Sequence, residues 1–288
     1  MKLHYYPVPD GNFGDYLNEM IWEKYLPVPF DNNDRELFVG IGTLLNDSLP
    51  KADKIIVFGS GVGYGGGLPS VDHTWKIYAL RGPLSAQKLG QDASLAVTDP
   101  AVLMHRVFPM QARPKRYKYS YIPHVHCMRI GMKSWQDVCN RLGIQLIDPR
   151  MPVEKVVDAM AETEIILAEA MHGAILADTY SIPWIPIVSN RTILPFKWQD
   201  WCYSLGLEYE PQHVIGLWDP PPLSSRWLKN PYIALNPIRK SIVTEQLRSI
   251  IAKSKPVLSD RRTMGRLTDI LEEKLELLKA NELALVPR

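Results

Sequence analysis

Cysteine and long apolar runs are both scarce in this sequence. Its 288 residues contain three cysteines, Cys127, Cys139 and Cys202, an odd number with no paired spacing. This pattern argues against a disulfide framework and favours free thiols in a reducing compartment. No apolar run approaches the roughly 18–20 residues that a helix needs to cross a bilayer. The amino-terminal residues lack the apolar centre of a signal peptide, so the sequence predicts a cytoplasmic protein.

An excess of charge of one sign is also lacking. Lysine and arginine number 33 against 31 acidic residues, which gives a formal net charge of +2 and no general case for nucleic acid as a partner. Repeats at solenoid periods and low-complexity tracts are absent from the sequence. Apolar residues make up 46% and charged residues 22% of the chain, which is ordinary for a globular protein of one or two domains.

The chain is organised around the stretch from residue 164 to residue 188. Apolar runs of strand length occupy 164–168 and 184–188, and small apolar residues at helical spacing fill 173–180 between them. This order predicts a strand, a turn, a buried helix and a second, parallel strand. Open α/β sheets bind ligands at the carboxyl ends of such strands, so the turn is the first candidate for a site.

Three residues, Met171, His172 and Gly173, fall in that turn, where the strand meets the amino terminus of the helix. The dipole and N–H groups of a helix amino terminus attract anions. A histidine placed there can meet an anionic substrate and give it a proton. A histidine that caps or packs the turn is the structural alternative, and geometry alone does not separate the two.

Two strand ends in the first half of the chain also carry polar residues. The loop 11–15, Gly-Asn-Phe-Gly-Asp, precedes a helical pattern over 16–25, so Asp15 either caps that helix or faces the ligand edge of the sheet. Arg81 follows a strand predicted at 76–80, where a guanidinium can bind carboxylate or phosphate through two hydrogen bonds. The alternative for Arg81 is an ion pair with a neighbouring carboxylate.

A glycine-rich loop at 59–67 follows the clearest strand of this half, 54–58. Such a loop lets a ligand approach backbone N–H groups, and Gly61 is the candidate contact. A flexible connection is an equal interpretation, because no P-loop lysine follows the glycines. Asp99 ends another strand-like run, where it either orients Arg81 or caps the following helix.

A basic, proline-containing stretch at 109–118 is interpreted as a linker to the second half, which opens with a strand predicted at 119–124. His124, His126 and Cys127 have the chemistry of metal ligands. The alternation of side chains along a continuing strand would place them on opposite faces, and no further acidic or cysteine cluster completes a site. The sequence therefore predicts no metal.

Four stretches, taken together and in order over residues 8–190, resemble one known family, the polysaccharide pyruvyl transferases. They are Gly11–Asp15, Ala79–Ser85, Thr98–Ala101, and Met171–Ala177 with Ser181–Ile187. Each stretch is weak alone, but the ordered set is specific. An Ile-Pro-His at the end of the second domain's first strand also recurs in that family, and here it ends at His124.

The resemblance implies a fold of two doubly wound, Rossmann-like α/β domains that face a cleft, as in GT-B proteins. We place the domains at 1–115 and 116–235, with a helical tail at 236–288 that packs back. The implied reaction transfers pyruvate from phosphoenolpyruvate to a sugar, usually as a 4,6-linked cyclic ketal. The implied acceptor is a surface glycan or a lipid-linked exopolysaccharide precursor at the inner face of the membrane.

The resemblance also suggests roles for residues. His172 is expected to be the general acid, and Asp15 is expected to accept the proton of the attacking hydroxyl. The residues expected to bind substrate are Arg81, His124, Met171, Gly173, Asn12, Gly61 and Glu169. The chemistry requires no redox cofactor, and none is expected.

One position departs from the family pattern. Many members carry an arginine two residues before the motif histidine, whereas this chain has Ala170 there, preceded by Glu169. The anion site is therefore expected to differ, and Glu169 is expected to contact the acceptor sugar instead.

Helical patterns are predicted at 135–142, 152–161 and in the tail. The tail places Leu267, Ile270, Leu271, Leu275 and Leu278 on one apolar face, which favours docking on the protein itself. Peripheral membrane contact through basic tail residues is the alternative, and the cations concerned are Lys253, Lys255, Arg261, Arg262 and Arg266.

Two other functions fit the same pattern. A GT-B glycosyltransferase that uses a nucleotide sugar would share the fold and would not need an Asp-x-Asp metal motif. A non-catalytic glycan-assembly protein with a decayed site belongs to a different class, and the presence of both Arg81 and His172 argues against it.

Overall fold

The computed structural model describes residues 1–26, 30–219 and 231–283. It contains two compact units, and neither is continuous in the sequence. The first unit takes in the described parts of Met1–Pro109, Leu194–Tyr209 and Ser259–Arg288, and the second those of Met110–Ile193 and Glu210–Leu258. These units differ from the three continuous segments expected from the sequence, because helices from later in the chain pack into the first sheet's core.

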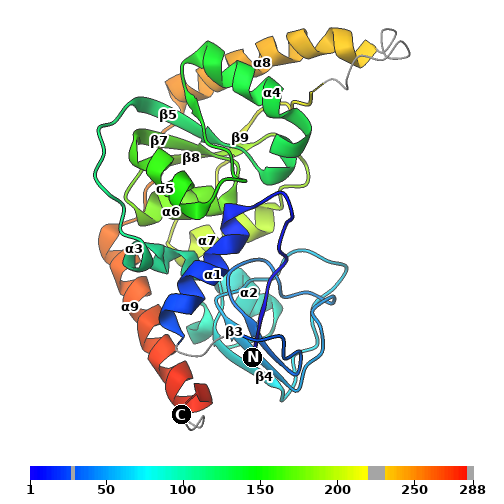
Figure 1. Ribbon diagram of the computed structural model, residues 1–288, viewed down its shortest axis with the longest axis vertical. Helices are drawn as coiled ribbons and strands as arrows, with labels where there is room; N and C mark the ends of the chain where they lie inside the picture. The colour runs from blue at the N-terminus through cyan, green and yellow to red at the C-terminus, as the bar shows by residue number, and fades with distance from the viewer. Residues whose placement is uncertain (27–29, 220–230, 284–288) are drawn as a thin grey trace. The chain divides into compact units, whose positions relative to one another are not determined.

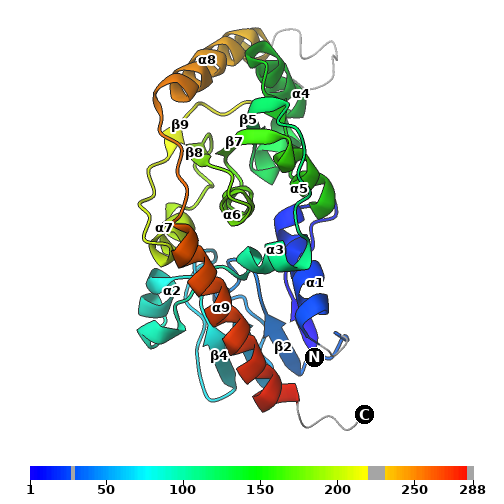
Figure 2. The same ribbon diagram turned by 90° about the vertical axis from the view of Figure 1, so that its left-hand side faces the viewer.

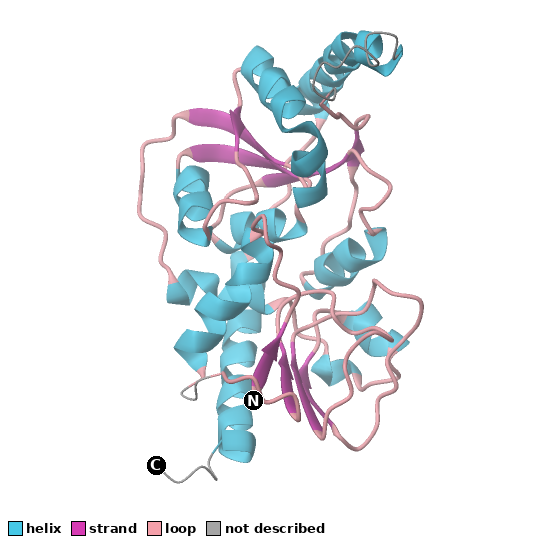
Figure 3. Cartoon of the chain, turned by 45° about the vertical axis from the view of Figure 1, so that its right-hand side comes forward, coloured by secondary structure: helices cyan, strands magenta, loops and turns pink. Residues whose placement is uncertain are grey.

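The first unit is built on a parallel sheet in the order β1-β2-β3-β4. Its strands are β1 (Lys2–His4), β2 (Glu36–Val39), β3 (Lys54–Phe58) and β4 (Trp75–Ala79). Figure 3 shows these strands in magenta, with loops leaving their ends. The order follows the chain without a reversal among the described strands. In this respect the sheet differs from the doubly wound topology expected of both halves.

Helices cover both faces of the first sheet. They are α1 (Phe13–Tyr25), α2 (Pro83–Lys88), α3 (Met104–Val107), α7 (Pro195–Ser204) and α9 (Arg261–Leu278), with short helices at Ala93–Leu95, Pro100–Leu103 and Lys279–Leu283. Alternation along β2 sends Phe38 to one face, where it packs against Trp22 of α1. Leu37 and Val39 point to the other face and join Ala86 of α2 in an apolar cluster.

The second unit is built on a parallel sheet in the order β6-β5-β7-β8-β9. Its strands are β5 (Tyr117–Ile122), β6 (Gln145–Leu146), β7 (Thr163–Ala168), β8 (Trp184–Val188) and β9 (Gln212–His213). Its helices are α4 (Val125–Leu142), α5 (Val153–Ala161), α6 (Met171–Thr179) and α8 (Pro231–Lys253). The strands predicted at 164–168 and 184–188 are confirmed as parallel neighbours, with a buried helix between them.

The order of this second sheet reverses between β5 and β7. From β5 the chain passes through α4 to β6 on one side, whereas from β7 it passes through α6 to β8 on the other. Helices α4 and α8 pack on one face of the sheet, and α5 and α6 lie on the opposite face (Figure 1). A reversal of this kind opens a crevice outside the carboxyl ends of the two strands, and ligands bind there in open α/β sheets.

The two tail helices belong to different units. Helix α8 packs on α4 in the second unit, and α9 runs along β4 in the first (Figure 2). Leu267, Leu271, Leu275 and Leu278 of α9 are all at most 5% exposed. The prediction that this apolar face docks on the protein itself is therefore confirmed. Among the described residues, no helix combines the length and apolarity that crossing a membrane requires.

Two predicted boundaries around β5 were wrong. The stretch predicted as a linker does join the two units, which divide between Pro109 and Met110, but it ends at Arg116 because β5 begins at Tyr117. Its side chains are bonded to the second unit: Arg113 pairs with Asp158 at 2.8 Å, and Lys115 Nζ donates to the carbonyls of Ala161 and Thr163 at 2.9 and 2.8 Å. The strand ends at Ile122, and α4 begins at Val125 instead of residue 135.

Glycine explains why the pattern of α4 was missed. Gly131 lies on the buried face of α4, where a Cβ would be 2.6 Å from the carbonyl oxygen of Leu217. The φ and ψ of this glycine, −142° and 24°, are non-helical and kink α4, so the helical repeat of apolar residues does not run continuously through Gly131.

Candidate functional site

The turn between β7 and α6 lies at the point where the second sheet reverses. Ala170 is the N-cap of α6, and its carbonyl accepts hydrogen bonds from the N–H groups of Gly173 and Ala174 at 2.9 and 3.3 Å. His172 is therefore the second residue of the helix and is partly exposed. Met171, just before it, is 5% exposed, so its side chain belongs to the core.

Gly173 has a packing role in this turn. A Cβ at this position would lie 3.3 Å from two side-chain carbons of Ile122, the last residue of β5. The missing side chain lets the first turn of α6 approach the end of the neighbouring strand. The glycine thus brings His172 close to the residues that follow β5.

Glu169 is fully buried and connects the ends of three neighbouring strands. Its Oε2 accepts from Tyr121 Oη at 3.0 Å and from the His124 N–H at 2.8 Å. Its Oε1 accepts from the Ser189 N–H at 2.9 Å and from the Ser189 hydroxyl. The expected contact of Glu169 with an acceptor sugar stays a prediction, because all of these contacts are with the protein. They fix the residues after β5 and β8 relative to the turn after β7.

His124 begins α4. It is the N-cap, and its Nδ1 accepts a hydrogen bond from the His126 N–H at 3.3 Å. A ring nitrogen that accepts carries no proton, so the neutral ring holds its proton on Nε2. The backbone N–H of His124 is anchored by Glu169, and the side chain is partly exposed. The partly exposed imidazoles of His124 and His172 therefore follow adjacent strands at the same sheet edge.

Sequence reasoning missed the partners of Glu169. Ser189 is the first residue after β8, so the strand-end rule that selected His124 would have selected it too. Tyr121 has no such signal, because it lies within an apolar strand and only burial reveals its role. Cys127 lies nearby, with its sulfur 3.5 Å from the Ser189 hydroxyl. Burial, reinforced by the charge of Glu169, raises the pKa of Cys127 to about 12, so it is not a thiolate nucleophile at neutral pH.

In the first unit, Arg81 follows β4 and is fully buried. Its Nε donates to Asp200 of α7 at 3.0 Å, and its two terminal nitrogens donate to Thr43 Oγ1 at 2.7 Å and to the Val62 carbonyl at 3.0 Å. Asp200 also accepts from the Ser85 N–H and hydroxyl at 2.9 and 2.5 Å. The alternative of an arginine paired with a carboxylate therefore describes this structure. A direct contact with the donor stays a prediction.

Gly61 and Gly82 make room for this ion pair. A Cβ on Gly61 would lie 2.3 Å from Cζ of Arg81, and one on Gly82 would lie 2.0 Å from the Asp200 carbonyl oxygen. The N–H of Gly61 donates to the Gly42 carbonyl at 3.0 Å, and that of Val62 to Ser85 Oγ at 3.0 Å. The start of the glycine-rich loop is thus an ordered part of the core. A substrate contact by Gly61 stays a prediction.

At the amino terminus of α1 the cap is Asn12, so of the two alternatives for Asp15 the N-cap does not describe this structure. Asn12 Oδ1 accepts from the Gly14 N–H at 3.3 Å, and its Nδ2 donates to Asp15 Oδ2 at 2.6 Å. Asp15 is the third residue of the helix, partly exposed, where a negative charge is stabilised by the helix dipole. The catalytic role of Asp15 and the substrate contact of Asn12 stay predictions.

Asp99 takes the capping role that the sequence allowed. Its Oδ1 accepts from the Ala101 N–H at 3.0 Å at the start of the helix Pro100–Leu103. Within the described ranges, no group of three His, Cys, Asp or Glu side chains is arranged to hold a metal ion.

The predicted residues thus form two groups, each at the carboxyl edge of its own sheet. In the second unit, Glu169 lies just before the turn that carries His172, and its carboxylate accepts a hydrogen bond from the backbone N–H of His124. In the first unit, Gly61 and Arg81 are in contact, and Asn12 pairs with Asp15. The group in the second unit includes His172, a partly exposed titratable side chain at the point where the strand order reverses. This arrangement is the one expected for proton transfer to an anionic ligand.

The sequence of the chain is similar to that of known proteins. The family model described as polysaccharide pyruvyl transferase matches residues 5–191. A protein named succinoglycan biosynthesis protein ExoV, from Rhizobium meliloti (strain 1021), is 41% identical over 217 residues, which cover 74% of this chain and 68% of that protein. No solved structure matches the chain. The family-model match and the 41% identity to this relative show that the chain belongs to the polysaccharide pyruvyl transferase family.

Proposed function

We propose that this chain transfers pyruvate from phosphoenolpyruvate to a sugar of a surface glycan or of a lipid-linked exopolysaccharide precursor. The product is a cyclic ketal, with 4,6-linkage as the expected form. One observation carries the proposal: His172 of the family motif is the second residue of α6, at the reversal point of the second sheet. The relative's name, a succinoglycan biosynthesis protein, supports an exopolysaccharide as the polymer concerned.

The donor requires groups that attract anions. Phosphoenolpyruvate carries a carboxylate and a phosphate, and the amino-terminal end of α6 attracts negative charge through its dipole. Met171 and Gly173 are proposed to contact the donor through their backbone, since the Met171 side chain is buried and Gly173 has none. His124 is proposed as a second donor ligand because it follows the adjacent strand.

The reaction follows from the charges that must move. A sugar hydroxyl attacks C2 of the enol, and C3 receives a proton to become a methyl group. The proton that leaves the first hydroxyl balances the proton gained at C3. A second hydroxyl of the same sugar then attacks C2, the C–O bond to phosphate breaks, and the last hydroxyl proton leaves with the phosphate. No electrons are exchanged with an outside group, so the ketal and inorganic phosphate complete the balance.

His172 is proposed as the acid that protonates C3. Histidine side chains titrate near neutral pH, which suits them to proton transfer. Its partly exposed ring can meet a substrate. Asp15 is proposed as the group that accepts the hydroxyl proton, because it is a partly exposed carboxylate in a family motif.

Arg81 retains a proposed part in donor binding, now with a structural condition. Its guanidinium is fully buried and bonded to Thr43, Val62 and Asp200. Direct contact with the donor would require that one of these bonds opens. The same contacts give it a second role, because they tie the glycine-rich loop to α7. The GT-B-like arrangement of the domains and the cytoplasmic location also stay predictions, as does peripheral membrane contact through the basic tail.

The test is an assay of the full chain with phosphoenolpyruvate and a panel of simple glycosides that carry free 4- and 6-hydroxyls. We expect release of inorganic phosphate together with an acid-labile ketal, identified by its methyl resonance in NMR spectra. Thermal unfolding with phosphoenolpyruvate or nucleotide sugars separates the glycosyltransferase alternative, because only the true donor stabilises the folded state. Stabilisation by a nucleotide sugar, without phosphate release from phosphoenolpyruvate, would overturn the proposal.

A further inference from the structure

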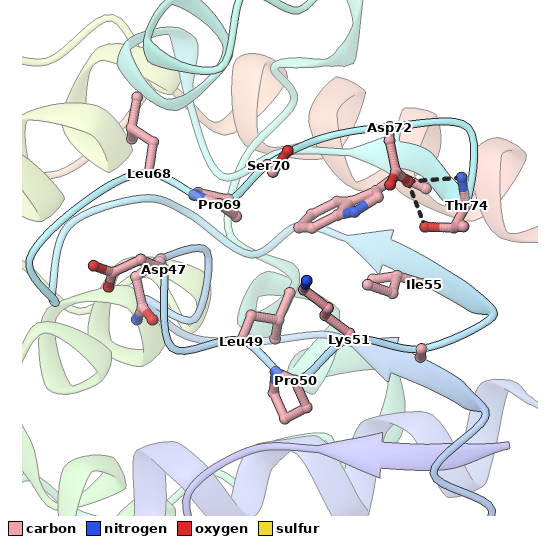
Figure 4. Close-up of a pocket in the computed structure, with 13 residues that line it drawn as sticks. Asp47, Leu49, Pro50, Lys51, Ile55, Leu68, Pro69, Ser70, Asp72 and Thr74 are labelled. Atoms are coloured by element: carbon pink, nitrogen blue, oxygen red, sulfur yellow. Dashed lines mark hydrogen bonds between the residues drawn. The ribbon is translucent and has the colours of Figure 1, made fainter.

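A cavity of about 430 Å³ lies in the first unit, away from the residues described above. It is bounded by two loops, one before β3 and one before β4. Figure 4 shows Asp47, Leu49 and Lys51 on the first loop, with Pro69 and Asp72 on the loop opposite. Because β3 and β4 both begin here, the cavity lies at the amino ends of the strands. Arg81 and Gly61 follow the opposite ends, so this cavity is a separate feature.

The floor of the cavity is apolar and includes an aromatic ring. Trp75, the first residue of β4, packs partly against the apolar cluster of the first unit and also lines the cavity. Ile55 and Leu49 continue the floor, and both contact the same cluster. An indole that is half covered by the core is held in one orientation, which makes it a rigid surface for a ligand.

The rim of the cavity is polar and fixed by its own hydrogen bonds. Asp72 accepts from the N–H and hydroxyl of Thr74 at 2.9 and 2.6 Å. The N–H of Asp47 donates to the Gly67 carbonyl at 3.2 Å. A Cβ on Gly65 would lie 2.9 Å from Asp47 Oδ1, so the glycine-rich loop can lie directly against this carboxylate. Lys51 adds a cation to the same rim.

A second hollow adjoins the first at one residue. It has a volume of about 280 Å³ and is lined by the glycine-rich loop, and the two hollows share Leu68. Tyr64, which is 41% exposed, and Phe196 line it. Lys88 also lines it, with its Nζ 5.2 Å from the centre of the Phe196 ring, and Lys197 Nζ lies 5.0 Å from the centre of the Tyr64 ring. Both rings therefore already contact a lysine, and the indole in the first cavity is the better stacking surface.

The chemistry of the lining selects among ligand classes. Two carboxylates and one ammonium group on the rim disfavour a phosphate or another anion, because like charges repel. A purely apolar ligand would leave the carboxylates and the ammonium facing it without hydrogen bonds. A sugar ring presents an apolar C–H face for an indole and hydroxyls that both donate to carboxylates and accept from lysine. A neutral sugar therefore fits both floor and rim.

We propose that this cavity binds a neutral sugar unit of a glycan, with Trp75 as the stacking surface and Asp47, Asp72 and Lys51 as hydroxyl partners. The choice of a glycan rests in part on the proposed function, since a transferase that acts on polymers gains from holding the acceptor away from the reacting end. The cavity and its lining do not depend on that function.

The experiment uses the full chain and three named probes: cellotetraose, laminaritetraose and maltotetraose. Binding is measured by saturation-transfer NMR and by calorimetry. We expect at least one tetrasaccharide to bind, and Trp75→Ala to weaken it by about ten-fold or more. Tyr203→Ala is the matched control, because it removes an aromatic ring that is 41% exposed on α7 and outside the cavity. If Trp75→Ala does not fold, the double variant Asp47→Ala/Lys51→Met, which changes only exposed side chains, replaces it.

The outcomes separate this proposal from the proposed function. Failure of all three tetrasaccharides to bind, or unchanged binding in a folded variant of the cavity, would overturn the cavity proposal. Phosphate release from phosphoenolpyruvate with a simple glycoside is measured in parallel. We expect Trp75→Ala to retain that release, because Trp75 begins β4 and is not among the residues proposed to bind the donor or to transfer protons. Tetrasaccharide binding without phosphate release in the unmodified protein would leave the cavity proposal standing and overturn only the pyruvyl transfer.

Discussion

The carboxyl edges of the two sheets are both organised around a fully buried charged residue, but they differ in what stays exposed. In the second unit, Glu169 receives hydrogen bonds from neutral donors, and the partly exposed His124 and His172 lie on the segments around it. In the first unit, Arg81 is matched by the opposite charge of Asp200, and both side chains are 0% exposed. A charged residue at a strand end is therefore not by itself a ligand, because its partners decide whether it faces a substrate or the core.

The largest effect is expected from His172, the partly exposed histidine at the carboxyl edge of the second sheet. His172→Gln retains hydrogen-bonding capacity but cannot act as an acid at neutral pH. General acid catalysis contributes about 10²–10⁴-fold, so we expect turnover to fall by that factor, with a much smaller loss in phosphoenolpyruvate affinity. The measurement is steady-state phosphate release alongside calorimetric donor binding.

His126→Gln is the control for this substitution, because His126 is an exposed histidine on α4 and is expected to leave turnover unchanged. Near-normal turnover in His172→Gln would exclude it as the acid. Weak donor binding with normal saturated turnover would instead make His172 a donor ligand.

The buried ion pair of the first edge should respond through stability. Asp200→Ala leaves the Arg81 guanidinium buried without its carboxylate, and breaking a buried pair in this way costs about 3–5 kcal/mol. We expect the free energy of unfolding, measured by urea denaturation, to fall by that amount. Asp269→Ala is the control, because its pair with Arg106 at 3.8 Å is more than half exposed on both sides and should change stability by less than about 1 kcal/mol. Equal effects of the two substitutions would contradict the structural role of Asp200.

Local patterns in the sequence were enough to predict the strand–turn–helix unit of the second sheet. The apolar runs of β7 and β8 and the small residues of α6 identify the strand–turn–helix unit within one or two residues, because a buried parallel unit leaves a continuous apolar signature. The surroundings of Arg81 had no such signature. Its carboxylate partner is 119 positions away in the chain, and no sequence pattern near Asp200 predicts the ion pair. Similarly, no pattern in the sequence indicated that the carboxylate of Glu169 accepts hydrogen bonds from residues at the ends of β5 and β8.

A substitution at Arg81 tests whether this residue binds the donor or only stabilises the fold. Arg81→Lys keeps the charge but cannot reach three partners with one nitrogen. A lost hydrogen bond to a charged group is worth about 1.5–3 kcal/mol, so we expect phosphoenolpyruvate affinity to fall about ten-fold or more. Calorimetry on a variant whose unfolding midpoint lies well above the assay temperature checks this. Arg35→Lys, at a position whose side chain is 82% exposed, is the control. Unchanged donor affinity in the folded Arg81→Lys variant would reduce Arg81 to a structural role.

Glu169→Gln tests the carboxyl edge of the second sheet, because it removes the negative charge of Glu169 and one of its two acceptor oxygens. The amide nitrogen of glutamine would face an N–H or O–H donor in place of one acceptor oxygen, and an unsatisfied buried group costs about 1–3 kcal/mol. We expect a loss of that size in the free energy of unfolding, together with a lower turnover, because either the His124 N–H or the Ser189 N–H loses its acceptor oxygen. Glu164→Gln, at an exposed position of β7, serves as the control. A stability as high as that of the unmodified protein would show that Glu169 does not organise this edge.

The smallest expected effect lies away from both edges, where the end of the tail docks on the first sheet. Tyr78 of β4 donates a hydrogen bond to Glu282 at 2.8 Å. Burial, with this bond to Glu282, raises the pKa of Tyr78 to about 12 from its ordinary 10.0. The neutral phenol is thus favoured by folding, so its contribution is complete below pH 10 and is lost as the pH rises through about 12. Tyr78→Phe should cost about 1 kcal/mol at neutral pH and should flatten the decline in stability between those two pH values. Denaturation midpoints of both proteins across this range decide the matter: parallel declines would mean that Tyr78 does not contribute to tail docking through this proton.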